Sequence, residues 1–195
     1  MPSQTVPDND LEGHALGINF DDGNIVSLQF RQACKQTCDA RDQLKSMGDV
    51  PCELSTLQAC LGSCKINYLL HAAGNVISEC ELKNYDDLLA AGLGNILDCP
   101  ISNLSSMQAA CGIQSGGLGL RSAVDLALPA FIASRTDCKH YVQELICNFF
   151  NDDLGDKFMD SFNSEMDVAI QSLKNKLSVG AAVEIDVCLA ESSEI

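Results

Sequence analysis

The chain has 195 residues, 46% of them hydrophobic and 20% charged, and a chain of this size and composition folds without needing disulfides or metal ions. Twelve basic residues stand against 27 acidic ones, which gives a net charge of −15. This charge argues against a broad basic face for nucleic acid phosphates or anionic lipid, because both need clustered Lys and Arg.

Neither a leader nor a membrane span is visible. The first residues have no basic region and no apolar run, and no segment approaches the ~18 apolar residues of a membrane helix. We therefore expect an intracellular protein, cytoplasmic or nuclear, that does not enter a membrane. In that setting its 11 cysteines are expected to be reduced and mostly buried.

Helical spacing begins after a polar N-terminus. Residues 1–24 are polar and end in an Asp-Asp-Gly-Asn turn signal, so we expect a flexible tail. A first helix is predicted from Ile25 to the Gly48–Pro51 region. A second helix over about 54–73 has few charges, which indicates burial on most sides.

Three more features continue this pattern in the middle of the chain. A third helix is predicted over about 76–97, and Ser102 or Asn103 can cap a short helix that reaches Cys111. Residues 112–120 contain too much glycine for a helix and predict an ordered loop.

The last third of the chain is predicted to be helical as well. One helix runs from about Ser122 to Ser134 with Pro129 as a possible kink, and another runs from Thr136 to Phe150. A final helix opens near 151–153, and residues 181–190 fit a strand or a helix equally. Together these elements predict an all-α bundle of about seven helices, in which 25–180 form one domain and 181–195 a tail.

Two cysteine pairs have the spacing C-x-x-x-C, and residues four apart share one face of a helix. The pairs are Cys34 with Cys38 and Cys60 with Cys64. If their helices are antiparallel, the sulfurs can meet in a disulfide-stapled hairpin or in a Cys₄ zinc site. Because each pair lies in an apolar stripe, reduced core cysteines are the favoured interpretation.

The glycine-rich loop contains Gly116, Gly117 and Gly119 but does not match a nucleotide-binding loop. No strand clearly precedes it and no Lys-Ser/Thr follows it. The glycines are better explained by a loop that crosses close over a helix. We expect no cofactor and no catalytic residue.

Several segments together resemble a known family. Residues 115–127, SGGLGLRSAVDLA, resemble the "GGLG-[IL]-RSA" segment that follows the polymerase palm in reverse transcriptases of non-LTR-type mobile elements. In the same order, the family's other motifs are similar to LQACLGSCKINYLLH at 57–71, YDDL at 85–88, QAA at 108–110 and FIAS at 131–134. The resemblance is best over 52–135 and extends more loosely over 25–150.

In that family this region is a helical, thumb-like part that would hold primer and template. The family's catalytic carboxylates lie upstream of it, and the arginine of its "YLLRT" motif is His71 here. The resemblance therefore implies a non-catalytic fragment with at most weak nucleic acid or protein binding. Two alternatives are the twin C-x-x-x-C hairpin and a piece of a polymerase that needs a separate palm.

Five cations are candidates for contacting the phosphates of an RNA–DNA hybrid or DNA. They are Arg31, Lys35, Lys45, Lys65 and Arg121. A solvated helix face explains the first three as well. Residues 137–195 hold 12 acidic and 4 basic side chains, which also suggests a basic protein as partner. The oligomeric state is left open.

Overall fold

The computed structural model describes residues 23–149, 152–177, 185 and 189. This part of the chain contains helices and turns and no strand, which confirms the all-α fold. Residues 1–22 of the predicted tail and nearly all of 181–195 lie outside the described residues, whereas the last two residues of that tail, Gly23 and Asn24, begin the first helix. No described helix is both long enough and apolar enough to cross a membrane.

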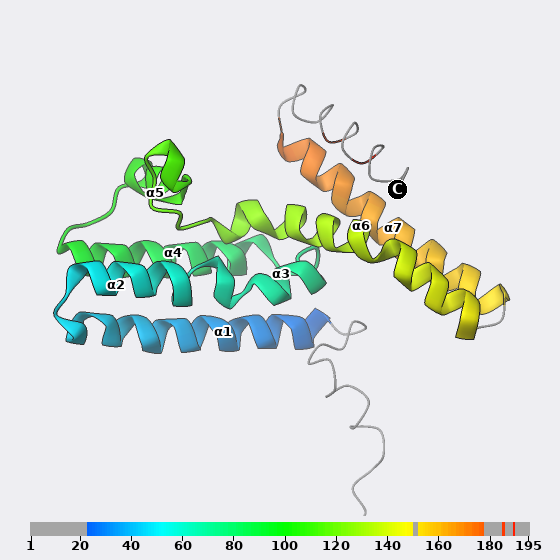
Figure 1. Ribbon diagram of the computed structural model, residues 1–195, viewed down its shortest axis with the longest axis horizontal. Helices are drawn as coiled ribbons and strands as arrows, with labels where there is room; N and C mark the ends of the chain where they lie inside the picture. Colours follow the sequence, from blue (N-terminus) through cyan, green and yellow to red (C-terminus); the bar gives the residue numbers. More distant parts are fainter. Residues whose placement is uncertain (1–22, 150–151, 178–184, 186–188, 190–195) are drawn as a thin grey trace, which may run out of the picture.

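Seven α-helices and several short helical turns follow one another in the described residues (Figure 1). The α-helices are α1 (Gly23–Leu44), α2 (Val50–Thr56), α3 (Asn67–Ala73), α4 (Glu79–Leu97), α5 (Asn103–Ala110), α6 (Ala123–Phe149) and α7 (Asp152–Lys176). The turns are η2 (Lys45–Met47), η3 (Leu57–Leu61), η4 (Ser63–Lys65) and η5 (Ile113–Ser115).

Residues 23–97 form a layered bundle, which we call the bundle (Figure 1). Phe30 of α1 and Tyr85 of α4 are completely buried at its centre, with ring centroids 5.9 Å apart. The first half of α6 packs on α3 and α4 and contributes Ala123 and Ala127 to the same core. Burial of this apolar cluster supplies the main stabilisation of the fold.

The second predicted helix is broken, so the prediction of one helix over 54–73 is wrong. At Gly62 the chain turns to an extended conformation, and a Cβ atom there would lie 2.5 Å from the carbonyl oxygen of Gln58. The buried Tyr85 hydroxyl donates to the carbonyls of Leu61 (2.7 Å) and Gly62 (3.2 Å). A tertiary partner thus satisfies carbonyls that a continuous helix would bond internally.

The helices predicted over 122–134 and 136–150 are one helix, α6, which corrects the predicted boundary at Thr136. The Thr136 hydroxyl donates back to the carbonyl of Ile132 at 2.9 Å, a bond made within a helix rather than at its N-cap. Pro129 lies inside α6 without ending it. Pro129 and Thr136 therefore do not end the helix, because α6 packs on α3 and on α7 along this stretch.

The α7 helix returns antiparallel along α6, and we call this pair the hairpin (Figure 1). Their seam is a small second core of Phe131, Ile132, Ala169 and Ile170. Only the first half of α6 lies on the bundle, so the hairpin extends beyond it. The fold therefore contains a well-packed bundle and a projecting pair of helices with a concave corner between them.

Candidate binding groove

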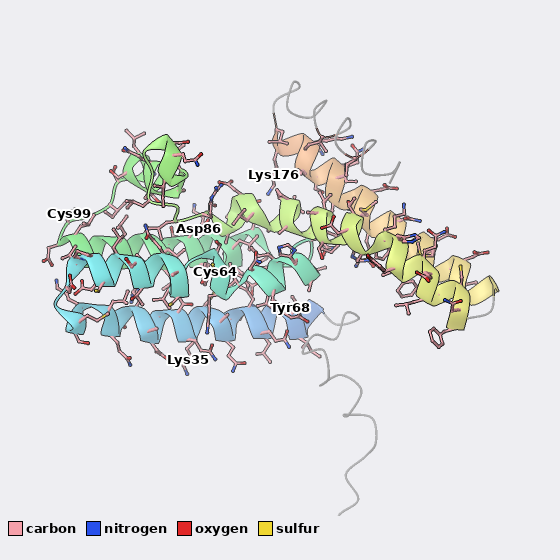
Figure 2. All side chains as sticks on the ribbon, viewed as in Figure 1. Lys35, Cys64, Tyr68, Asp86, Cys99 and Lys176 are labelled. Carbon is pink, nitrogen blue, oxygen red and sulfur yellow. The ribbon has the colours of Figure 1, made fainter. Side chains whose placement is uncertain are left out.

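The five predicted phosphate contacts do not form one set. Arg31 donates to Glu81 at 2.8 Å, and Lys45 is ion-paired with Asp98. Lys35, which projects from the outer side of α1 in Figure 2, makes no ion pair with a described residue. The same holds for Lys65 and Arg121, which come from two other segments, η4 and the loop before α6.

Carboxylates therefore already neutralise two of the five cations. The remaining three are exposed and arise from α1, η4 and the glycine-rich loop. A phosphate track needs several cations aligned on one surface. Binding of an RNA–DNA hybrid stays a prediction, and the ion pairs weaken its physical basis.

The glycine-rich loop is ordered, as the sequence predicts. Its backbone turns back on α5, where the amides of Leu118 and Leu120 both donate to the carbonyl of Ala109 at 3.1 Å. A Cβ atom at Gly117 would collide with the carbonyl oxygens of Cys111 and Gln108. Gly116 and Gly119 have φ values of 76° and 70°, which only glycine adopts easily. These glycines therefore allow the loop to pass close over α5.

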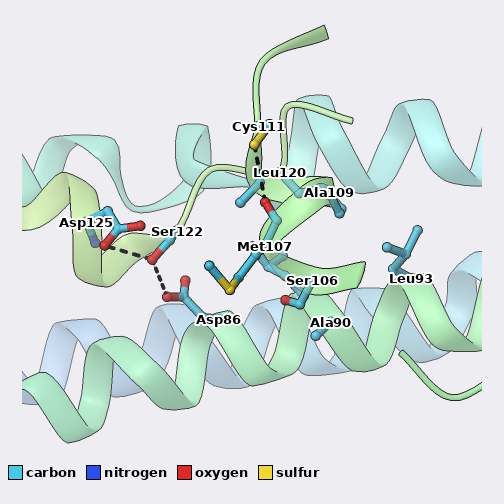
Figure 3. Close-up of a pocket in the computed structure, with 12 residues that line it drawn as sticks. Asp86, Ala90, Leu93, Ser106, Met107, Ala109, Cys111, Leu120, Ser122 and Asp125 are labelled. Carbon is cyan, nitrogen blue, oxygen red and sulfur yellow. Dashed lines mark hydrogen bonds between the residues drawn. The ribbon is translucent and has the colours of Figure 1, made fainter. Parts of the chain in front are cut away.

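Asp86 of α4 holds the start of α6 in place (Figure 3). Its carboxylate accepts hydrogen bonds from the Ser122 hydroxyl at 2.7 Å and from the Ala123 amide at 2.6 Å. Burial raises the pKa of Asp86, and the hydrogen bonds act against that rise. The two segments of sequence that resemble the polymerase family at 85–88 and 115–127 therefore meet here as a helix cap.

The cysteines correct the expectation that most are buried. All ten described cysteines are free thiols, and seven of them are exposed. Cys34 and Cys38 are half-buried on α1, whereas Cys60 and Cys64 are exposed on either side of the break at Gly62. Burial, together with the charge of Glu81, raises the pKa of Cys34 to about 11. Cys34 is therefore a neutral thiol at neutral pH.

The four paired cysteines do not assemble a metal site in the structure. In the described part of the chain, no three His, Cys, Asp or Glu side chains lie close enough together to hold a metal ion. Cys60 and Cys64 would share one face only on a continuous α-helix. The π-helical turn η3 and the extended backbone of Gly62 interrupt the helix there.

A groove lies elsewhere, in the corner between the bundle and the hairpin. Its volume is about 730 Å³, and it is lined mainly by α3, α6 and α7, with Val26 of α1 at its base. Three large apolar side chains on its walls are more than half exposed, Tyr68 (59%), Val76 (53%) and Phe158 (54%). Such a concave apolar surface is typical of a binding site.

Arg135 in the groove lining is already paired with neighbouring side chains. The Arg135 guanidinium lies 4.4 Å from the ring centroid of Phe162 and 5.0 Å from that of Phe131. It also donates to Glu165 at 2.7 Å. Two aromatic faces and a carboxylate therefore hold Arg135 as part of the wall. His71 and Asn75 add hydrogen-bonding groups to the lining of the groove.

None of the five cations predicted from the sequence lines the groove. Phe158 is a large apolar residue of the last helix, yet its side chain is more than half exposed and does not lie in a core. The groove joins α3 and α7, which are about ninety residues apart, so no local spacing marks it. An available signal was the number of large apolar residues on the last two helices, which is greater than the seam between α6 and α7 can bury.

Comparison with family models, with curated proteins and with solved structures finds no match to this chain.

Proposed function

We propose that the chain is a non-catalytic intracellular binding domain, similar to the thumb-like region of a mobile-element reverse transcriptase, whose groove binds an apolar helix of another protein. The open groove beside Tyr68, Val76 and Phe158 carries this proposal. Its volume and apolar walls suit side chains such as Leu or Phe projecting from one face of a helix. Covering these exposed groups removes apolar area from water, which favours association.

The ion pairs favour protein over nucleic acid as the partner. Arg31 and Lys45 are paired with carboxylates, and Arg135 is enclosed between two rings with Glu165. A protein helix needs none of these cations, whereas a nucleic acid partner would need to separate them from their carboxylates. The net charge of −15 opposes the approach of any polyphosphate further.

The first test uses a labelled, uncharged amphipathic peptide of about 18 residues, built from Leu on one face and Gln on the other. We expect fluorescence anisotropy to show saturable binding to the wild-type protein and a loss of about tenfold in affinity for Phe158→Lys. Leu104→Lys is the matched control, because Leu104 is 76% exposed on α5 away from the groove. Equal binding by both variants would refute the groove as the site.

The second test titrates a labelled RNA–DNA hybrid into the same proteins at low salt and at about 0.15 M salt. We expect no binding at either salt concentration. Tight binding that weakens steeply with salt, and that falls when Lys35, Lys65 and Arg121 are replaced by Gln, would assign the chain to nucleic acid instead.

A further inference from the structure

Arg135 lies in the lining of the groove with most of its hydrogen-bond donors unused. A guanidinium carries N–H donors on Nε and on both terminal nitrogens. Among the described residues, only Glu165 accepts from it, and the bond comes from Nη2 at 2.7 Å. The side chain is 17% exposed, and none of its nitrogens is both fully buried and without a partner. Because Arg135 lines the groove, the remaining donors are open to a molecule bound there.

Neighbouring rings hold these donors in place. The guanidinium carbon lies 4.4 Å from the ring centroid of Phe162 and 5.0 Å from that of Phe131. Phe131 is completely buried and Phe162 is 5% exposed, so packing fixes both rings. A guanidinium held in this way has lost much of its side-chain freedom before a partner arrives. A hydrogen bond to it therefore costs little further entropy.

Glu165 places acceptors beside the donors of Arg135. Its side chain also lines the groove and is 47% exposed. Among the described residues, only Arg135 donates a hydrogen bond to it, whereas a carboxylate accepts several. The groove wall therefore presents N–H donors and carboxylate lone pairs side by side, and the two charges cancel.

This pair discriminates between the side chains that enter the groove. A primary amide matches it, because the amide oxygen accepts from Arg135 while the amide NH₂ donates to Glu165. A carboxylate would meet the like charge of Glu165, and an ammonium group would meet the like charge of Arg135. A Leu side chain over the pair would remove unused donors and lone pairs from water without replacing their hydrogen bonds.

We infer that the groove selects an apolar helix that carries one Gln or Asn within its Leu- or Phe-rich face, and that Arg135 and Glu165 bind this amide. The inference rests on the proposed function, since it names a feature of the partner of the same groove. Apolar contacts with side chains such as Tyr68 and Phe158 supply most of the affinity. The amide adds selectivity and fixes the register of the helix, and it leaves the ion pair intact.

The experiment starts from the labelled, uncharged Leu/Gln peptide of the first test and replaces the Leu residues of its apolar face with Gln, one position at a time. With the full-length protein, we expect affinity to fall at every position except one, where Gln binds about fivefold more tightly than Leu. Glu or Lys at that position should bind about tenfold more weakly than Gln.

The variant Arg135→Met tests the donors. Met keeps an apolar stem between the two rings but has no N–H group. We expect the preference for Gln over Leu at the selected position to disappear in this variant. Comparing both peptides on both proteins isolates the contact between the amide and Arg135 from a general loss of affinity.

A reversal of specificity tests Glu165. Glu165→Gln removes the charge that repels a carboxylate and keeps an acceptor for Arg135. We therefore expect the peptide with Glu at the selected position to bind more tightly than the one with Gln. The matched control is Glu79→Gln, since Glu79 is also ion-paired but lies outside the groove lining. It changes the net charge equally and should keep the preference for Gln. If Arg135→Met does not fold, this reversal decides alone.

The outcomes separate this inference from the proposed function. If Gln weakens binding at every position while Phe158→Lys still weakens the Leu peptide, the groove binds apolar helices without selecting an amide, and only the inference is overturned. A preference for Gln that persists in Arg135→Met, or a reversal that is absent in Glu165→Gln or equal in Glu79→Gln, also overturns it. If no peptide binds, or if a concentration-dependent dimer abolished by Phe158→Lys occupies the groove, both proposals fail.

Discussion

The bundle and the hairpin bury their apolar side chains to different extents. In the bundle, Phe30, Leu57 and Tyr85 are enclosed on every side by other helices. In the hairpin, the seam of four buried residues leaves Tyr141 and Leu145 more than half exposed. Two packed helices have one shared face, so apolar groups outside it face water. We therefore assign most of the stability to the bundle, whereas the binding proposed above uses the exposed apolar side chains of the groove, which both regions line.

The largest expected effect is the loss of a bundle aromatic. Phe30→Ala removes a completely buried ring packed against Tyr85, and we expect the free energy of unfolding to fall by about 3–5 kcal/mol. Phe149→Ala in the hairpin removes a ring that is 77% exposed and should cost less than about 0.5 kcal/mol. Urea unfolding followed by circular dichroism measures both. Similar losses in the two variants would contradict the division between the two regions.

A smaller effect is expected where the bundle holds the start of the hairpin. Asp86→Ala removes the acceptor for the Ser122 hydroxyl and the Ala123 amide, and we expect a loss of about 2 kcal/mol. Hydrogen exchange should quicken most in the first turn of α6. The neighbouring Asp87 is exposed, so Asp87→Ala serves as the control and should change the unfolding free energy little. Unchanged exchange at the first turn of α6 in Asp86→Ala would show that α6 does not depend on this cap.

These cases show which parts of the fold local sequence determines. The N-termini of α4 and α5 follow from short-range signals. The Ser78 and Ser102 hydroxyls accept capping hydrogen bonds from the backbone amides of Glu81 and Ser105. The ordered loop at 112–120 is marked by its glycines, two of which have positive φ. Signals of this kind act within about four residues and are visible in the sequence.

The breaks and the groove depend on distant partners instead. Gly62 interrupts a helix because Tyr85, 23 residues later, binds the carbonyls at the break. Thr136 looks like a cap, but α6 continues through it and packs on α7. The groove requires the angle at which the hairpin leaves the bundle, and no local pattern encodes that angle.

Acid should weaken the contact between α1 and α4. Burial by itself would raise the pKa of Glu81, but hydrogen bonds from Ser27 (2.5 Å), Arg31 (2.8 Å) and Ser78 (2.9 Å) outweigh it and lower the pKa below its ordinary value of 4.5. The ionised form thus stabilises the fold above about pH 4.5. This stabilisation is lost as the pH falls through the lowered pKa.

The measurement compares unfolding free energies of the wild type and Glu81→Gln between neutral and acidic pH. We expect the wild type to be more stable by less than about 1 kcal/mol at neutral pH and the difference to vanish at low pH. Asp86, whose pKa is raised chiefly by burial, gains stability on acidification, and taking the difference between the two proteins cancels it. A difference that grows on acidification would reverse the assigned sign.

The smallest effect concerns the ion pair that joins the end of α7 to the start of α4. Lys176 lies 3.1 Å from Glu79, but the two side chains are 48% and 70% exposed. A double-mutant cycle with Lys176→Ala and Glu79→Ala should therefore give a coupling of about 0.2–0.5 kcal/mol that shrinks with salt. If this pair set the angle of the hairpin, the variants would also lose affinity for the labelled amphipathic peptide. Because α3 and α4 already pack on the first half of α6, we expect that affinity to change less than about twofold. A larger change would mean that the Lys176–Glu79 pair holds the groove open. Salt, which screens this pair, would then change the shape of the groove.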